Sequence, residues 1–277
     1  MKIAVIVGTV AAAAAAPTFG AGFECLIEPS QVVEMRASVD GIIGTVHVQR
    51  GDVVRKGQVL VELQSTAERV AVESARFRSL MEGQVASARN RVDYATKKLA
   101  RLADLQQQNY ASVQSRDEAD AERRLAESEL QAAIENRDLA KIEHRRAQEQ
   151  LALRTLVSPF NGVVLDRTLN PGDLAESGSG RKPVLKLAQI DPLRVDIVLP
   201  AALFGQVRPG QKVTVVAQVG GGRHDAVVKV VDKVIDAASS TFVARLELPN
   251  AKGSVPGGAR CNAEIDGVVA PGRANRG

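Results

Sequence analysis

The chain has 277 residues, of which 45% are hydrophobic and 25% are charged, with a formal net charge of +4. This composition belongs to a folded protein rather than a disordered one, and the mild, interleaved charge gives no basis for nucleic-acid binding. Only 3% of the residues are aromatic and Trp is absent, so the cores must consist of Val, Leu, Ile and Ala. Such residues suit narrow modules better than one large globule.

Residues 1–22 read MKIAVIVGTVAAAAAAPTFGAG, in which one Lys precedes an apolar run and then small residues. This is the layout of a secretory signal peptide. An uncleaved anchor helix is the alternative, but the apolar run is short and weakly hydrophobic for a membrane span. We therefore expect a chain exported to a bacterial periplasm, with residues 1–22 removed.

Two segments, 39–63 and 160–187, follow the same plan. Each opens at a Gly, reaches a Gly-Asp pair ten residues later and ends in an apolar strand. The Gly-Asp pairs are turn chemistry. A few short strands cannot bury a core alone, so we predict two halves of one lipoyl-like β-sandwich over residues 37–65 and 156–190.

Residues 66–152 contain no Pro and only one Gly, and they are rich in helix-forming residues. A heptad row in the first part and a looser one in the second predict two antiparallel arms of a coiled coil. The first row is Val85, Ala88, Val92, Ala95, Leu99 and Leu102, and the second is Leu125, Ala132, Leu139 and Ile142. We expect the hairpin tip near residues 108–112, with Ser112 capping the second arm. One unbroken helix is the alternative, but it would carry the two sandwich halves far apart.

Residues 191–268 contain five β-like runs separated by Gly and Pro turns, and a short helical turn is expected near Pro200–Phe204. With residues 23–36 they predict a small antiparallel β-barrel, followed by a disordered tail at 269–277. Cys25 and Cys261 are the two cysteines of the chain. The even count and an exported location favour a disulfide between them over two free thiols.

No enzyme chemistry stands out in the sequence. The three histidines show no spacing typical of a metal site or a catalytic triad. The Gly-rich loop at residues 177–181 lacks the Lys-Ser/Thr end of a phosphate-binding loop. We therefore expect no catalytic residue, no cofactor and no metal.

The order of these parts resembles the periplasmic adaptor family, also called membrane fusion proteins, which serve tripartite efflux pumps and type I secretion systems (the haemolysin-D-like proteins). The resemblance covers residues 25–268. It implies an elongated α+β multidomain protein, in which a lipoyl-like β-sandwich is split by a long antiparallel α-helical coiled-coil hairpin and joined to a small antiparallel β-barrel. It also implies a non-catalytic adaptor that assembles as a trimer or hexamer. Such an adaptor links an inner-membrane transporter of RND or ABC type to an outer-membrane efflux channel.

Family members that dock on an outer-membrane channel carry an Arg, a Leu four residues later and a Ser seven residues after that. These are Arg101, Leu105 and Ser112 here. The resemblance implies that Leu105 inserts between helices of the channel tip, while Arg101 and Ser112 make polar contacts. The alternative is that Arg101 is a solvated arm residue, Leu105 belongs to the seam and Ser112 is only a cap.

The chain departs from the commonest family pattern, because a fourth, membrane-proximal domain is not evident in it. Two other functions stay open. A lipoyl or biotinyl carrier would present a Lys on the turn between the sandwich halves, where this chain has the hairpin instead. A purely structural coiled-coil function would account for the two helical arms but not for the sandwich or the barrel.

Overall fold

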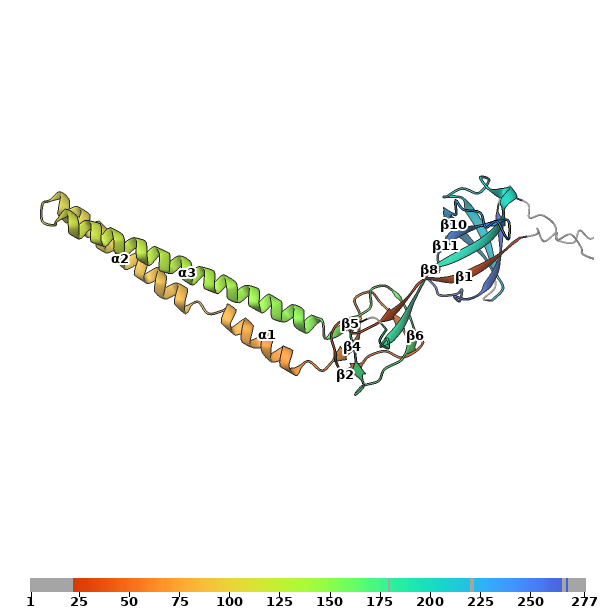
Figure 1. The fold of residues 1–277 in the computed structure, drawn as a ribbon, viewed down its shortest axis with the longest axis horizontal. Coiled ribbons are helices and arrows are strands. Elements are labelled where there is room, and N and C mark those ends of the chain that lie inside the picture. Colours follow the sequence, from red (N-terminus) through yellow and green to blue (C-terminus); the bar gives the residue numbers. More distant parts are fainter. Residues whose placement is uncertain (1–21, 179, 220–221, 266–267, 269–277) are drawn as a thin grey trace, which may run out of the picture. The chain divides into compact units, whose positions relative to one another are not determined.

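The computed structural model describes residues 22–178, 180–219, 222–265 and 268 (Figure 1). The expected signal peptide, apart from its last residue, and the expected tail at 269–277 lie outside the described residues. The chain forms two units: one spans Val33–Leu187, and the other combines the residues before Val33 with those after Leu187. Strands β1 (Phe23–Met35) and β8 (Leu185–Pro200) each run from one unit into the other.

The first unit contains a small β-sandwich. Its strands are β2 (Gly41–Val46), β3 (Val53–Val54), β4 (Val59–Leu63), β5 (Thr155–Val157), β6 (Gly162–Arg167) and β7 (Leu174–Ala175). One sheet has the order β5-β4-β2-β7, and the other pairs β3 with β6 and β6 with β8. The core consists of aliphatic side chains from both halves, including Ile43, Leu60, Leu156 and Val164.

The two halves of the sandwich repeat the same hydrogen bonds. The N–H of Gly51 donates to the carbonyl of Val164 at 2.8 Å, and the N–H of Gly172 donates to that of Ile43 at 2.8 Å. Both glycines have positive φ, 93° and 94°, which a residue with a side chain rarely adopts. The Asp after each glycine accepts a bond from the backbone N–H three residues earlier, at 2.7 and 2.8 Å. Each turn is thus tied to the opposite half.

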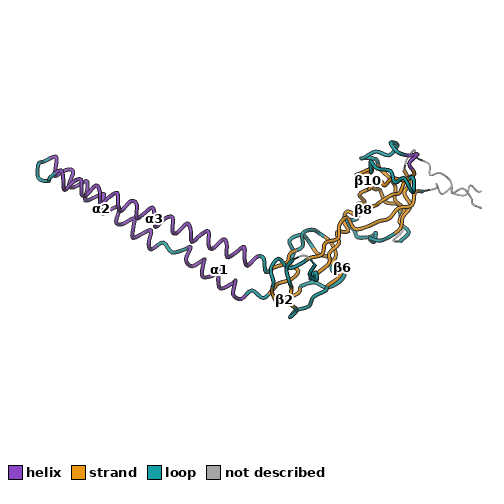
Figure 2. Tube along the Cα trace, in the orientation of Figure 1, coloured by secondary structure: helices purple, strands orange, loops and turns teal. Residues whose placement is uncertain are grey.

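Three helices lie between β4 and β5: α1 (Thr66–Ser79), α2 (Gly83–Gln107) and α3 (Val113–Ala152). Because β4 and β5 are antiparallel neighbours, the chain leaves the sheet and returns beside the point of departure. α3 packs against both α1 and α2 (Figure 2).

The outgoing arm is not one helix, because residues 80–82 separate α1 from α2. The sequence predicted two arms but not this interruption. The row of α1 residues that faces α3 ends at Ala75 and Ser79, and a further heptad step would lead to residue 82. The row of α2 starts instead at Val85, three residues later. Such a shift of three residues interrupts heptad packing, and the chain absorbs it by leaving residues 80–82 outside both helices.

The predicted row of α2 matches the structure, because Val85, Ala88 and Ala95 are buried. The predicted row of α3 was wrong: Leu125, Leu139 and Ile142 are 54–61% exposed. The row that faces the other arm lies elsewhere on α3. Ala126, Ala133 and Ala140 face that arm, and each follows directly after a residue of the predicted row or its heptad position. The whole row comprises Ala119, Arg123, Ala126, Leu130, Ala133, Arg137, Ala140, His144, Ala147 and Leu151, all buried or half-buried. Small residues there allow the helix axes to approach closely.

The second unit is a closed six-stranded β-barrel. Its strands are β1, β8, β9 (Lys212–Ala217), β10 (Arg223–Val231), β11 (Thr241–Leu248) and β12 (Arg260–Ile265). They follow the order β1-β12-β9-β10-β11-β8, and a pairing of β8 with β1 closes the sheet. The predicted helical turn is present as a 3-10 turn at Ala201–Leu203. Large buried residues fill the interior, among them Ile197, Leu246 and Phe242.

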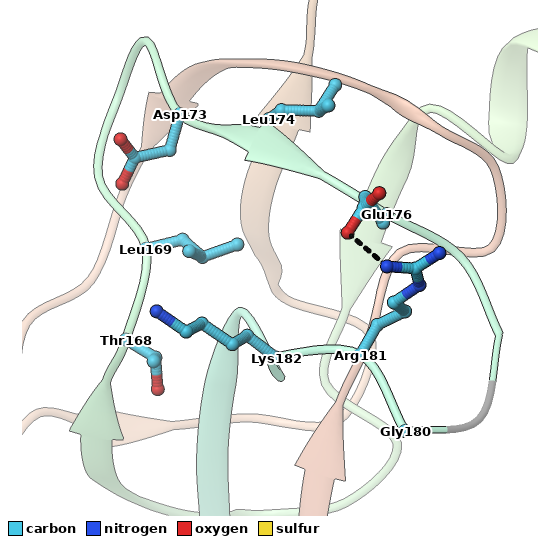
Figure 3. A pocket seen from close by; sticks show the side chains of 8 residues that line it. All are labelled: Thr168, Leu169, Asp173, Leu174, Glu176, Gly180, Arg181 and Lys182. Atoms are coloured by element: carbon cyan, nitrogen blue, oxygen red, sulfur yellow. Dashed lines mark ion pairs between the residues drawn. The ribbon is translucent and has the colours of Figure 1, made fainter.

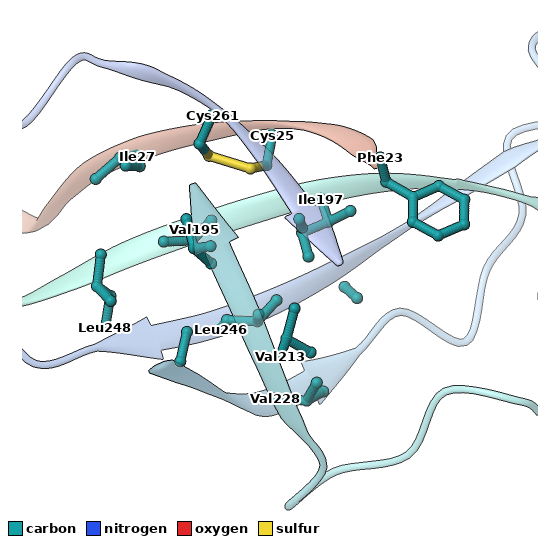
Figure 4. Packing of buried hydrophobic residues seen from close by; sticks show 14 of the residues in the cluster. Phe23, Cys25, Ile27, Val195, Ile197, Val213, Val228, Leu246, Leu248 and Cys261 are labelled. Carbon is teal, nitrogen blue, oxygen red and sulfur yellow. A yellow bond between two sulfur atoms is a disulfide. The ribbon is translucent and has the colours of Figure 1, made fainter. Parts of the chain in front are cut away.

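Cys25 and Cys261 form a disulfide between β1 and β12, where they are direct partners in the strand register (Figure 4). Their Cα atoms are 4.9 Å apart, and 236 positions separate them in the sequence. The disulfide therefore joins the first and last strands of the barrel. Both cysteines are buried against the barrel core.

Candidate functional site

The hairpin tip is a tightly bonded turn. α2 ends in a Schellman motif: the N–H of Tyr110 donates to the carbonyl of Leu105 at 2.8 Å, and that of Asn109 to the carbonyl of Gln106 at 3.0 Å. Asn109 has φ 64°, a left-handed conformation that Asn tolerates better than most residues. The break that the sequence predicted near residue 108 thus has a defined geometry, held by the backbone itself.

Ser112 is the N-cap of α3, as the sequence predicted. Its Oγ accepts a hydrogen bond from the N–H of Ser115 at 3.1 Å and lies 2.8 Å from the Ser115 hydroxyl. A capping hydroxyl satisfies one of the free N–H groups at a helix start. The residue is nevertheless exposed, so the hydroxyl's remaining hydrogen-bonding capacity faces solvent.

The three predicted docking residues lie together near the tip. Arg101 and Leu105 are one helical turn apart on α2, and Ser112 begins α3. Leu105 is 41% exposed and is therefore only partly used by the seam. The guanidinium Nε of Arg101 donates to the carbonyl of Lys97 at 3.4 Å, and no acidic partner is paired with it among the described residues.

Two further apolar side chains stand at the tip. Tyr110 is 81% exposed and Val113 is 58% exposed. Exposed apolar residues that gather on one small surface indicate a contact site. Tyr110 follows a run of polar residues, Gln106–Asn109, whereas nothing in the sequence around Val113 indicates exposure. That residue looks like an ordinary first residue of a helix.

Ion pairs join the two arms along their length. Arg78 pairs with Glu143 at 3.7 Å, Arg91 with Glu129 at 2.7 Å, and Lys98 with Glu122 at 2.6 Å. Glu122 raises the pKa of Lys98, mainly through their hydrogen bond. Exposed pairs of this kind are individually weak. Their repetition fixes which residue of one arm lies opposite which residue of the other.

The base of the hairpin is held by Arg154. Its guanidinium pairs with Glu68 of α1 at 2.6 Å and donates to the backbone carbonyl of Asp40 at 2.8 Å. The Asp40 carboxylate accepts bonds from the N–H and hydroxyl of Ser177, at 2.6 and 2.7 Å. These bonds, the backbone one foremost, hold the pKa of Asp40 below its ordinary value. One polar chain thus links α1, the sandwich and its Gly-rich loop.

A hollow of about 570 Å³ lies beside that loop (Figure 3). It bears both signs of charge, including an ion pair between Glu176 and Arg181 at 3.2 Å and the ammonium group of Lys182. Within the described ranges, no cluster of His, Cys, Asp and Glu could hold a metal ion. His47 bonds to Glu62 at 3.0 Å, and His144 lies in the row that faces the other arm.

None of the helices among the described residues is long and apolar enough to cross a membrane. The side chains at the tip contain no nucleophile and base arranged for catalysis. What the tip offers is a rigid, exposed surface of apolar and polar groups.

Known proteins are similar to this chain in sequence. The pyoverdine export membrane fusion protein PvdR of Pseudomonas putida is 28% identical over 199 residues, covering 72% of this chain and 51% of its own length. The multidrug resistance protein MdtA of Cronobacter turicensis is 28% identical over 186 residues, covering 67% of this chain and 41% of its own length. The chain therefore spans about half the length of these relatives.

Solved structures share the fold. MacA from Actinobacillus actinomycetemcomitans matches with a TM-score of 0.71 at 23% identity, covering 88% of this chain and 77% of that one. The membrane fusion protein Spr0693 from Streptococcus pneumoniae matches with a TM-score of 0.58 at 21% identity, covering 87% of this chain and 96% of that one. The family model for the CzcB-like barrel-sandwich hybrid domain matches residues 31–180. The chain belongs to this CzcB-like family, and the resemblance to membrane fusion proteins predicted from the sequence is confirmed.

Proposed function

We propose that this protein is a periplasmic adaptor of a tripartite efflux pump, linking an inner-membrane transporter to an outer-membrane channel without chemistry of its own. The observation that carries the proposal is the hairpin tip. A hydrogen-bonded turn presents Leu105, Tyr110 and Val113 to solvent at the end of two long helices. Such a surface suits docking rather than catalysis.

The parts of the chain have separate roles in this proposal. The helices of residues 66–152 form an antiparallel coiled coil, because the heptad row of α3 continues without interruption along the helix. In this proposal the coiled coil extends to the outer-membrane channel. The sandwich, over residues 37–65 and 156–190, anchors the hairpin through Arg154. The barrel, over residues 23–36 and 191–268, faces the transporter, of RND or ABC type.

At the tip, we propose that Leu105 enters a groove of the channel while Arg101 and Ser112 form polar contacts. Leu105 is partly exposed and Arg101 is free of acidic partners within the described chain. Export to the periplasm by a signal peptide and assembly into a trimer or hexamer belong to the same proposal. The names of PvdR and MdtA point to export and to multidrug resistance in those proteins.

The second candidate function, suggested by the lipoyl-like sandwich, is a carrier of lipoyl or biotinyl groups. Such a carrier presents its Lys on the turn that joins the two halves. In this chain β4 and β5 are joined by the helices instead. The intact mass of the exported protein tests this point, since either group would add its own mass.

Photo-crosslinking in living cells tests the adaptor function. A photoreactive residue at Gln108, in the tip, should capture an outer-membrane channel protein that mass spectrometry can identify. The same photoreactive residue at Arg89, an exposed position in the first third of α2 and far from the tip, should not capture it. If Gln108 captures nothing, or only copies of this chain, while the protein is exported and folded, the adaptor function fails and a structural coiled-coil protein becomes the better interpretation.

A further inference from the structure

The interruption of the outgoing arm leaves a hollow on the side of the hairpin. Residues 80–82 form no helix, while α3 runs past them without a break (Figure 2, where this segment is teal). A hollow of about 500 Å³ lies at this level, and residues of α1, α2 and α3 all line it. Its volume is within the range of small-molecule binding sites.

The hollow follows from the residues on its two sides. On α3, Ala133 and Ala140 belong to the row that faces the other arm, and both line the hollow. Only a large residue on the outgoing arm would fill the space opposite such small side chains. α1 ends at Ser79, however, and the buried row of α2 starts at Val85. Gly83, at the start of α2, fills nothing, because a Cβ atom there would meet no other atom within 4 Å.

One part of the lining is apolar. Val85 is buried, and Ala133 and Ala140 are half-buried. Met81, in the interruption itself, also lines the hollow and is 53% exposed. A Met side chain has three rotatable bonds and adapts its shape to an apolar neighbour. These four side chains therefore offer a surface on which the apolar body of a ligand can pack.

The charged part of the lining has a single sign. Within the described part of the chain, the only charged residues that line the hollow are Arg78 and Arg137. The Nη1 atom of Arg78 is 3.7 Å from the carboxylate of Glu143, and that of Arg137 is 3.7 Å from the carboxylate of Glu82. Because 3.7 Å is too long for a hydrogen bond, both Nη1 groups keep the capacity to donate to an anion.

The two guanidinium groups are held in place by their other nitrogen atoms. Nε and Nη2 of Arg137 donate to the carboxylate of Asp138 at 3.2 and 3.1 Å. Nη2 of Arg78 donates to the hydroxyl of Ser74 at 3.2 Å. A guanidinium group that is already oriented loses less conformational freedom when it binds a carboxylate.

We propose that this hollow binds a small organic carboxylate with an apolar body, such as a medium-chain fatty acid. The carboxylate accepts hydrogen bonds from the Nη1 groups of Arg78 and Arg137, and the apolar body packs on Met81 and Val85. The whole length of α2 separates this site from the hairpin tip, and the inference does not depend on the adaptor function. A bound ligand contacts α1, α2 and α3 together, so it stabilises the outgoing arm across its interruption.

Isothermal titration calorimetry with decanoate, below its micelle concentration, tests the site on the full exported chain. We expect saturable binding of one decanoate per chain. 1-Decanol has the same apolar body but no carboxylate, so it should bind at least about tenfold more weakly, as expected when charge-assisted hydrogen bonds are lost.

Gly83→Leu tests the position of the ligand, because the new side chain would occupy the hollow. The backbone tolerates it, since a Cβ atom at Gly83 has open space around it and Leu is a better helix former than Gly. Gly83→Leu should abolish decanoate binding. Ala86→Leu adds a Leu on the same turn of α2, at an exposed residue that does not line the hollow, and should bind decanoate like the parental chain.

Arg78→Gln tests the recognition of the anion. It removes one cationic donor and should weaken decanoate binding about tenfold. The matched control is Arg76→Gln, which removes an exposed guanidinium group on the same helix but outside the hollow, and it should leave the affinity unchanged. Circular dichroism gives a second readout: decanoate should raise the midpoint of helix unfolding in the parental chain but not in Gly83→Leu.

Four results would overturn the proposal. They are the absence of saturable binding to the parental chain; binding that Gly83→Leu leaves intact, which would place the ligand elsewhere; equal affinity for decanoate and 1-decanol, which would exclude recognition of the carboxylate; and an equal loss of binding in Ala86→Leu. None of these results affects photo-capture from Gln108, so failure of this site and failure of the adaptor function are distinguishable.

Discussion

The barrel and the helical hairpin bury different kinds of residue. The barrel interior holds Phe242, Ile197 and Leu246 with almost no exposed area, each contributing about 1.5–3 kcal/mol on burial. The hairpin buries mostly alanines, such as Ala95 and Ala126, and each contributes much less, about 0.8 kcal/mol for a methyl-sized group. Many of its large apolar residues are exposed instead.

The comparison shows that one part of the chain has a large apolar core while another part forms a long, thin structure with little buried apolar area. The barrel is stabilised by a compact core and a disulfide. The two arms of the hairpin are held together by small buried residues and weak ion pairs. Several Leu, Tyr and Phe side chains of the arms remain exposed to solvent. The predictions below test this difference from the largest expected effect to the smallest.

The largest effect is expected in the barrel core. Phe242 is 2% exposed and meets Phe204 edge to face, with ring centroids 5.4 Å apart. Phe242→Ala should destabilise the barrel by about 3–5 kcal/mol through lost burial and a cavity. Chemical denaturation followed by a probe in the barrel measures it. Val198→Ala, in the same barrel but 52% exposed, should change little, and an equal loss would contradict the account.

The disulfide should come next. Replacing Cys25 and Cys261 by Ser frees the first and last strands, which 236 positions separate, and should cost about 2–5 kcal/mol of barrel stability. Reduction of the parental protein should reproduce the shift, while the helical signal of the hairpin stays unchanged. Equal denaturation midpoints with and without reductant would show that the disulfide adds nothing.

The register of α3 can be tested with adjacent residues. Ala126 is buried and Leu125 is 61% exposed, so Ala126→Leu should overpack the seam and destabilise the hairpin by about 1–3 kcal/mol. Leu125→Ala should stay within about 0.5 kcal/mol. Circular dichroism during thermal unfolding reports both. The opposite order of effects would restore the register predicted from the sequence.

The cap at the tip should have a smaller effect. Ser112→Ala removes the acceptor for the Ser115 N–H and should cost about 1 kcal/mol. Ser112→Asn keeps a capping side chain and should retain most of the stability. If docking depends on the hydroxyl itself rather than on the cap, Ser112→Asn should keep the fold and lose the partner.

The smallest effect concerns pH. Bonds from Ser177 lower the pKa of Asp40, so the folded state favours the ionised carboxylate. This contribution is present above the pKa of the unfolded chain and is lost as the pH falls through the lower folded value. Asp40→Asn should therefore reduce stability near neutral pH and flatten the loss of stability as the pH falls below the ordinary pKa of an aspartate. An unchanged acid profile would show that the network around Arg154 does not depend on this charge.

Much of the fold could be predicted because local patterns determine it. The Gly-Asp turns of the sandwich and the cap at Ser112 follow from backbone preferences of single residues. The register of α3 could not be predicted, because leucines stand out in hydrophobic patterns while alanines decide how closely helices pack. The break at residues 80–82 was missed because good helix-forming residues surround it, and only the comparison with α3 reveals the shift of three residues.

The residues of the candidate site could also be predicted only in part. Arg101, Leu105 and Ser112 could be found by resemblance to a motif, and the structure gathers them near one turn. Val113 and the exposed apolar residues of the arms could not be found, since the exposure of an apolar residue depends on the packing of the whole hairpin. The sequence pattern alone assigns such residues to the interior.

The most direct test of the adaptor account is photo-capture from Gln108 in a Leu105→Asp background. Leu105 is 41% exposed, so a charge there should leave the hairpin folded but keep the tip out of an apolar groove. Gln114→Asp adds the same charge at an exposed position of the same tip and serves as the control. The account predicts that Leu105→Asp abolishes capture of the channel while Gln114→Asp retains it. Undiminished capture with Leu105→Asp would contradict docking through this residue.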